Sequence, residues 1–176
     1  MAELIDLYDV DRQLTGKTTI RGVHLEEGTY RMVVHVCIFN SKGEMLIQQR
    51  QPFKEGWPNL WDITVGGSAI AGDDSRSAAE REVMEELGLP IDLSGEMPKI
   101  ILPFDQGFDD IYIITMDVDL SALHLQESEV QAVRWAGMKD IFALMEAGQF
   151  LPYHRSLIEL LFALKDSRGA HVSRLG

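Results

Sequence analysis

The apolar and polar positions of the chain fall into several short stretches that either alternate or run apolar, as β-strands do. The turn-forming run Asn-Ser-Lys-Gly at residues 40–43 separates two of these stretches, which predicts a β-hairpin. After a loop at residues 51–60 that is rich in proline, glycine and tryptophan, a short strand is expected to end at Gly66 and Gly67. Strands are predicted at residues 17–24, 30–40, 44–50, 61–65, 100–102, 110–118 and 130–135.

A helical pattern extends over residues 74–87, where apolar side chains recur every four positions. An aspartate at its start can cap the helix, and Gly88 followed by Pro90 ends it. Apolar spacing predicts two more helices at residues 138–146 and 156–165. Because strands and helices are interspersed without a repeat or a low-complexity linker, the sequence predicts one mixed α/β (α+β) domain.

Composition narrows the classes of protein that this chain can belong to. Its 176 residues suffice for one domain with a buried core, and 45% of them are hydrophobic. No apolar run reaches the ~18 residues that a membrane span needs. The start of the chain lacks the layout of a signal peptide, so a cytoplasmic location is expected. The single cysteine, Cys37, excludes an intramolecular disulfide and a thiolate zinc cluster, and is expected to pack in the core.

The charge balance is strongly acidic, with 28 acidic and 16 basic side chains and a formal charge of -12. This balance argues against a surface that binds nucleic-acid polymers, which would need clustered lysine and arginine. An acidic protein can still handle phosphates if a divalent cation bridges the two.

Three glutamates in the predicted helix at residues 74–87 are the most informative feature of the sequence. Glu82, Glu85 and Glu86 stand at positions i, i+3 and i+4, so their carboxylates should project from one side of the helix. They repel one another, and locally only Arg81, which can pair with Glu85, offsets that charge. Mg²⁺ or Mn²⁺ would turn the repulsion into attraction and would also bind phosphate oxygens. The alternative is an ordinary solvated helix face.

The segment at residues 67–89 resembles the Nudix box, a motif of Gly, five residues, Glu, seven residues and then Arg-Glu-aliphatic-x-Glu-Glu-x-Gly-aliphatic. Asp73 stands where the family has Glu. That family residue is structural and extends towards the box arginine, so Asp73 and Arg81 are expected to form a shorter and weaker brace. The positions that match in register are Gly67, Arg81, Glu82, Val83, Glu85, Glu86, Gly88 and Leu89.

The resemblance implies the Nudix fold, a mixed β-sheet sandwiched between helices, over about residues 30–162. It also implies a divalent metal, Mg²⁺ with Mn²⁺ as the alternative, bound by the carboxylates of Glu82, Glu85 and Glu86 and by the carbonyl of Gly67.

A further catalytic glutamate often comes from a later loop in this family. Glu129 is the residue expected here, because it precedes Trp135 by the spacing that some family pyrophosphohydrolases use, and Glu127 is the second choice. The alternative for Glu129 is a solvated residue at a strand edge. If neither acts, Glu85 of the box is the expected base.

Arg31, Arg50 and Lys54 are the basic residues near the box in the family's layout. Any of them could bind a substrate phosphate, arginine being favoured by its bidentate geometry. The competing interpretation is that they only balance an acidic surface. The five histidines are scattered without the spacing of metal ligands.

The region around the box particularly resembles the branch that contains isopentenyl-diphosphate isomerase. That enzyme needs a cysteine just before the box and then a histidine ligand, but Gly66 and Ser68 stand at those positions. His24 can match the first of its two upstream histidine ligands, whereas Arg31 falls where the second should be. Moving protons on a carbon skeleton needs the replaced groups, which argues against isomerase activity.

Hydrolysis needs only what the sequence supplies: glutamates for the metal and a carboxylate that accepts a proton as water attacks phosphorus. The expected substrate is a small-molecule diphosphate, an X-linked nucleoside diphosphate or a related organic diphosphate. The other alternative is a catalytically silent nucleotide-binding module.

No membrane or nucleic-acid partner is expected, and a homodimer is compatible with the resemblance. The predicted organisation is an N-terminal extension packed on the domain (1–29), a Nudix hydrolase domain (30–165) and a C-terminal tail (166–176).

Overall fold

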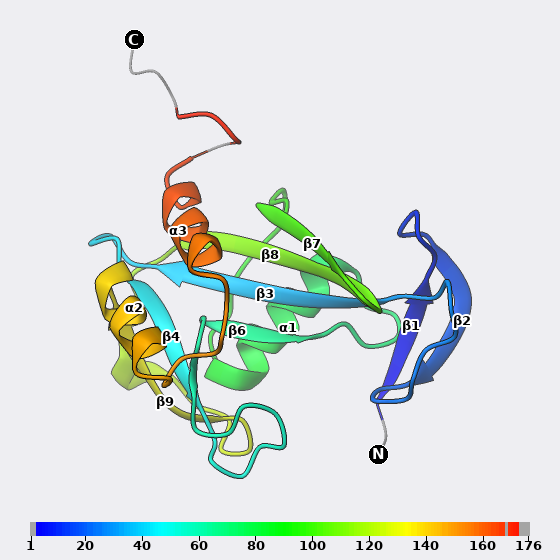
Figure 1. Cartoon of the computed structure of the whole chain (residues 1–176), viewed down its shortest axis with the longest axis horizontal. Coiled ribbons are helices and arrows are strands. Elements are labelled where there is room, and N and C mark those ends of the chain that lie inside the picture. Colours follow the sequence, from blue (N-terminus) through cyan, green and yellow to red (C-terminus); the bar gives the residue numbers. More distant parts are fainter. Residues whose placement is uncertain (1–2, 168, 173–176) are drawn as a thin grey trace.

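The computed structural model describes residues 3–167 and 169–172, and its described part contains a mixed sheet, a separate two-stranded sheet and helices on both faces of the mixed sheet (Figure 1). The strands are β1 (Leu4–Tyr8), β2 (Leu14–Ile20), β3 (Arg31–Phe39), β4 (Met45–Arg50), β5 (Trp61–Asp62), β6 (Val65–Ser68), β7 (Ile100–Phe104), β8 (Gly107–Thr115) and β9 (Val130–Ala136). The helices are α1 (Ser75–Leu87), α2 (Met138–Glu146) and α3 (Arg155–Leu164), with a short 3-10 turn at Leu120–Ala122.

Strand β3 is the centre of the mixed sheet. One of its edges pairs in parallel with β8 along the whole strand, from Arg31 opposite Gly107 to Phe39 opposite Thr115. The other edge pairs antiparallel with β6, and it meets β4 only at Phe39 opposite Met45. The predicted hairpin is therefore confirmed only next to its turn. Strand β4 diverges from β3 and pairs with β9 and β5 instead.

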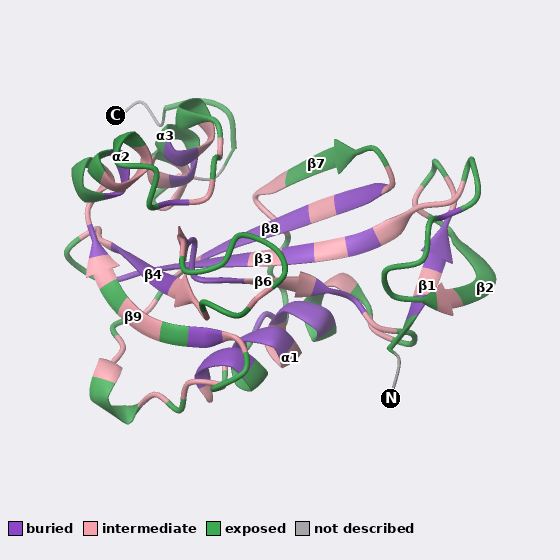
Figure 2. Cartoon of the chain, turned by 60° about the horizontal axis from the view of Figure 1, so that its bottom comes forward, coloured by how far each residue is buried: buried purple, intermediate pink, exposed green. Residues whose placement is uncertain are grey.

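Two apolar layers cover the two faces of this sheet. Alternate residues of β3, such as Val34 and Val36, pack with Val83 and Leu87 of α1. The residues between them, such as Cys37 and Phe39, pack on the other face with Ile141 of α2 and Ile158 of α3. Figure 2 shows the buried side of α1 turned towards the sheet. The fold class predicted from the sequence, a mixed sheet between helices, is confirmed.

Helices in the described part of the chain are short, and none of them is both long and apolar enough to cross a membrane. The three predicted helices are confirmed with small changes at their ends: α1 begins at Ser75 and α3 spans Arg155–Leu164.

The N-terminal strands β1 and β2 form an antiparallel hairpin beside the main sheet (Figure 1). The predicted strand at residues 17–24 is shifted, because β2 ends at Ile20 and Gly22 takes a left-handed φ of 91°. Strand β1 was not predicted, although four of its five residues are apolar and only Asp6 interrupts them.

Strand β6 corrects a second prediction. The glycine pair at 66 and 67 was expected to end a strand, but it lies inside β6 and pairs with His35 and Val34 of β3. Glycine is needed there because side chains of other elements approach the backbone closely, as the site shows below.

Candidate metal centre and active site

Helix α1 places two of the three glutamates of the box motif inside the protein. The Asp74 carboxylate caps the helix by accepting from the Ser77 N–H at 2.8 Å, and Gly88 ends it with a φ of 63°. In this register Glu82 and Glu86 are buried, with 8% and 6% of their surface exposed, whereas Glu85 is exposed. Glu85 lies at the exposed edge of this side of the helix: the Arg81 Nη1 that donates to Glu82 at 3.0 Å also donates to Glu85 at 3.3 Å.

The Glu82 carboxylate lies directly against the backbone of Gly67. A Cβ at position 67 would overlap the carboxyl carbon and both carboxylate oxygens of Glu82. This contact places the backbone of β6 directly beside a carboxylate of α1. The first glycine of the box is thus required because a side chain at position 67 would collide with Glu82.

The Glu86 carboxylate is held by Gln48 of β4, whose Nε2 donates to Glu86 Oε2 at 2.9 Å. Burial raises the pKa of Glu86 to about 8, although the hydrogen bond from Gln48 acts in the opposite direction. The negative charges of Glu82, Glu129 and Asp62 raise this pKa further. A buried carboxylate among other carboxylates is an electrostatic strain that a cation would relieve.

The Gln48 side chain also has a buried polar atom without a hydrogen-bond partner. Gln48 Oε1 is buried and accepts no hydrogen bond, while the Nε2 of the same amide faces Glu86. Within the described residues, no three His, Cys, Asp or Glu side chains form a ready-made metal cluster. The donor set is nevertheless all oxygen and partly buried, which fits Mg²⁺ or Mn²⁺.

Arg81 braces the box from the other side of Glu82. Its Nε and Nη2 donate to Asp73 Oδ2 at 3.1 and 2.9 Å, and Nη2 also donates to the Ser68 carbonyl at 3.1 Å. Its Nη1 donates to Glu82 Oε1 at 3.0 Å. The short Asp73 side chain therefore contacts the arginine through its Oδ2 atom, and Arg81 links the loop before α1 to the Glu82 carboxylate.

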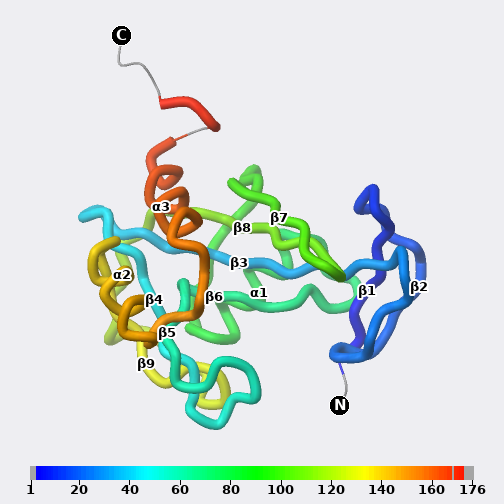
Figure 3. Tube along the Cα trace, viewed as in Figure 1, coloured from blue at the N-terminus to red at the C-terminus, as the bar shows by residue number. Residues whose placement is uncertain are grey.

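Glu129 lies in the turn before β9, close to these carboxylates. Lys54 Nζ donates to Glu129 Oε1 at 2.6 Å, and the Gln51 N–H donates to the Glu129 carbonyl at 3.0 Å. The loop at residues 51–60 and the turn before β9 run side by side (Figure 3). The negative charge of Glu129 is near enough to help raise the pKa of Glu86. The second choice, Glu127, is exposed.

Comparison with known proteins identifies the family of the chain. A family model described as the NUDIX domain matches residues 29–161, well over half of the chain. The chain belongs to the Nudix family. An uncharacterized Nudix hydrolase of Listeria monocytogenes is 51% identical over 166 residues, which cover 94% of this chain and 97% of the relative.

Two more distant similarities were also found. An isopentenyl-diphosphate Δ-isomerase of Corynebacterium glutamicum is 23% identical over 160 residues, which cover 85% of this chain and 84% of that enzyme. The crystal structure of DR0079 from Deinococcus radiodurans superposes with a TM-score of 0.70 at 23% identity, covering 90% of this chain and 97% of that one. The chain is thus a Nudix hydrolase by family, and the superposition shows that it shares its fold with the DR0079 structure.

The basic residues expected near the Nudix box have different surroundings. Arg50 Nη1 lies 4.0 Å from Asp62 Oδ2, and its Nε donates to the Gly56 carbonyl at 3.1 Å. The guanidinium of Arg31 lies 5.6 Å from the centre of the Phe104 ring. Arg31 forms no ion pair with any residue in the described part of the chain, and burial lowers its pKa. Lys54, by contrast, is occupied by Glu129.

A histidine–aspartate pair lies beside the box and was missed by sequence reasoning. His35 Nδ1 is 2.7 Å from Asp109 Oδ1, joining β3 to β8. The His35 ring fills the space that a side chain at Gly66 would need. Burial alone would lower the pKa of His35, but the hydrogen bond and charge of Asp109 outweigh it and raise the pKa. The only sequence signal was a polar residue within an apolar strand.

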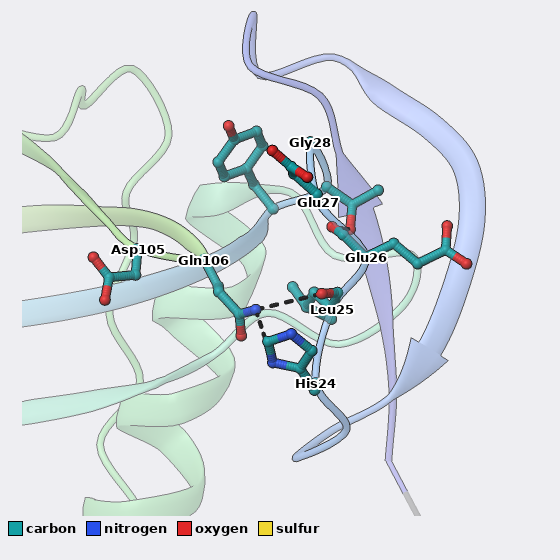
Figure 4. Close-up of a pocket in the computed structure, with 9 residues that line it drawn as sticks. His24, Leu25, Glu26, Glu27, Gly28, Asp105 and Gln106 are labelled. Carbon is teal, nitrogen blue, oxygen red and sulfur yellow. Dashed lines mark hydrogen bonds between the residues drawn. The ribbon is translucent and has the colours of Figure 1, made fainter.

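A pocket of the protein lies away from these carboxylates. It has a volume of about 490 Å³ and is bounded by residues 24–30 and by the turn between β7 and β8 (Figure 4). Gln106 spans it, with Nε2 3.2 Å from His24 Nδ1 and 3.4 Å from the Leu25 carbonyl. Its lining carries Glu26, Glu27 and Asp105, and no buried unpartnered polar atom points into it.

Proposed function

We propose that this Nudix protein hydrolyses a diphosphate linkage in an X-linked nucleoside diphosphate or a related organic diphosphate, in a reaction that depends on a divalent metal. The observation that carries the proposal is the pair of buried carboxylates, Glu82 and Glu86, set against Gly67 and the unpartnered Gln48 Oε1. Glu82 pairs with Arg81 at 3.0 Å, whereas Glu86 forms no ion pair within the described residues and accepts only from the neutral Gln48 amide. A buried carboxylate without counter-charge is costly, and a cation-dependent function accounts for the retention of Glu86.

Glu82 and Glu86 would hold Mg²⁺, or Mn²⁺, with the backbone of Gly67 and the exposed carboxylate of Glu85 as further donors. The bound ion would neutralise diphosphate charge and make water more acidic. Arg81 keeps Glu82 in place through the bond at 3.0 Å. Gln48 orients Glu86 in the same way from β4.

Glu129 is the proposed base that accepts the proton of the attacking water. It is partly exposed, lies in a turn and faces the carboxylates of α1. Lys54, which pairs with it, would hold it away from Glu86 until substrate phosphate competes for the ammonium group. Arg50 and Arg31 are the proposed phosphate contacts, and Arg31 is free of ion pairs among the described residues.

Isomerase activity is disfavoured by the surroundings of Gly66. Because His35 fills the space of a side chain at position 66, a cysteine there would collide with the imidazole ring. Incubation with isopentenyl diphosphate in deuterated buffer is expected to give no dimethylallyl product and no carbon-bound deuterium. Substantial isomerisation would contradict this assignment. A silent binding module is disfavoured because the carboxylate set is complete.

The decisive experiment is a substrate screen in ¹⁸O-labelled water with Mg²⁺, with the products analysed by mass. The panel contains nucleotide sugars, dinucleoside polyphosphates, ADP-ribose, NADH, oxidised deoxynucleoside triphosphates and isoprenoid diphosphates. The proposal requires a phosphate product that carries one ¹⁸O, and its formation must disappear in Glu86→Gln. Turnover that persists without divalent metal would contradict it.

A further inference from the structure

The loop between β6 and α1, residues 69–74, is held from outside by the N-terminal strand β1. The Ala71 N–H donates to the Leu4 carbonyl at 2.8 Å, and the Gly72 N–H donates to Asp6 Oδ2 at 2.7 Å. Gly72 itself has a left-handed φ of 94°. Two consecutive amides of an exposed loop are thereby fixed by a strand that lies outside the mixed sheet.

From inside, the same loop is held by the Asp73 carboxylate. Its Oδ2 accepts from Arg81 Nε and Nη2 and from the Ile70 N–H at 3.2 Å. Aspartate has a single methylene between carboxylate and backbone, so Asp73 engages Arg81 only if the loop backbone stays close to α1. The loop path therefore decides whether Arg81 is positioned to contact Glu82.

The tip of the same N-terminal hairpin is also linked to the start of α1 through Asp110 of β8. Arg12 Nη2 donates to both oxygens of Asp110 at 2.8 Å, and Asp110 is 1% exposed. The Ser75 hydroxyl, from the first residue of α1, donates to Asp110 Oδ2 at 2.6 Å. The hairpin is thus fastened to the middle of the 69–74 loop and, through Asp110 of β8, to Ser75 just after it, which gives β1 a firm base from which to hold the loop.

We propose that Asp6 is a positioning residue for the Nudix box: by accepting the Gly72 N–H it keeps the loop close to α1, so that Asp73 engages Arg81 and Arg81 orients Glu82. The inference rests on the proposed function, because it assigns Asp6 a role in shaping the metal centre. Its chain of contacts runs from Asp6 to Gly72, then through Asp73 and Arg81 to Glu82.

The test begins with Asp6→Ala, which removes the acceptor, and Asp6→Asn, which keeps a carbonyl acceptor. Isothermal calorimetry with Mg²⁺ alone should show affinity about five- to tenfold weaker in Asp6→Ala, the scale of one net hydrogen bond, and near wild type in Asp6→Asn. Asp9→Ala is the matched control, since Asp9 caps only its own turn through the Asp11 and Gln13 amides. Its Mg²⁺ affinity should not change.

A second arm separates positioning from general loss of stability. Asp73→Glu lengthens the brace, so it should restore most of the Mg²⁺ affinity in the Asp6→Ala background while giving no gain in the wild-type background. Simple additivity of the two substitutions would overturn the proposal. Unchanged Mg²⁺ affinity in Asp6→Ala would also overturn the proposal if NMR shows that the Gly72 amide exchanges hydrogen faster in this variant, because the contact is then lost without an effect on the metal.

The two proposals fail in different ways. If the wild-type protein binds Mg²⁺ but hydrolyses no diphosphate, the proposed function is wrong while the affinities of the Asp6 and Asp73 variants still decide the role of Asp6. If the wild-type protein binds no Mg²⁺, both proposals are overturned.

Discussion

The Glu82 carboxylate occupies the space that any side chain at Gly67 would need. Gly67→Ala should therefore push the carboxylate away from β6, at a cost of about 1–3 kcal/mol in the free energy of unfolding. Because the carboxylate is displaced, activity should fall on the order of 100-fold, as when a key electrostatic contact is lost. The measurements are denaturant unfolding and initial rates.

The control for this substitution is Gly56→Ala. A Cβ at Gly56 would meet no atom within 4 Å, so stability and rate should stay close to those of the wild type. Equal losses in the two variants would show that added bulk at Gly67 does not act through Glu82.

Glu86→Gln tests the metal directly. The amide keeps the shape of the side chain but loses the charge, so Mg²⁺ or Mn²⁺ binding in calorimetry should weaken by at least about tenfold, corresponding to one charge-assisted contact. The metal-free protein should unfold at the same or a higher denaturant concentration, because burial of this carboxylate is unfavourable. Unchanged metal affinity would remove Glu86 from the site.

Glu129→Gln tests the proposed base. Loss of a general base should lower kcat by roughly 10²- to 10⁴-fold while KM changes little. Glu127→Gln is the control, and its rate should be nearly that of the wild type because Glu127 is exposed in the same turn. Both variants should be assayed across a Mg²⁺ titration. Rescue of Glu129→Gln by excess metal would identify Glu129 as a ligand, and full activity at limiting metal would return the base role to Glu85.

The His35–Asp109 pair predicts a pH dependence of stability. The pKa of His35 is raised in the folded protein, so its stabilising contribution is fully present below pH ~6.5 and is lost as the pH rises through the folded-state pKa. Urea unfolding between pH 5.5 and pH 8.5 should show this loss in the wild type. In His35→Gln the loss should be smaller, and stability at low pH should fall by about 1.5–3 kcal/mol, the scale of a hydrogen bond to a charged group.

Asp109→Asn is the matching variant for the histidine. It keeps an acceptor but removes the charge that favours the imidazolium ion, so it should reduce the pH dependence in the same direction as His35→Gln. An identical pH profile in the wild type and both variants would show that other groups account for the change in stability.

Sequence patterns predicted helices well because their signals are local. The start of α1 at an aspartate cap, its end at Gly88 and the burial of Val83 and Leu87 all depend on residues within a few positions of one another. The family motif likewise placed Glu82, Glu86 and Arg81 correctly on this helix.

The features that sequence patterns missed depend on contacts between distant segments. Gly66 and Gly67 look like a strand end, and only the approach of His35 and Glu82 explains why β6 continues through them. Glu85 is exposed because the buried face of α1 carries Glu82 and Glu86 instead. Gln48, an ordinary polar residue at the end of a strand, joins the site because β4 packs over Glu86.

The complete burial of Cys37 has a practical consequence. This side chain of β3 has no exposed surface, packs under α2 and α3 with Ile141 and Ile158, and its pKa is raised by burial. A thiol-reactive dye can therefore label the protein only during openings that separate β3 from its neighbours. Since the sequence contains one cysteine, the labelling rate under native conditions measures the free energy of that opening, without any engineered reporter.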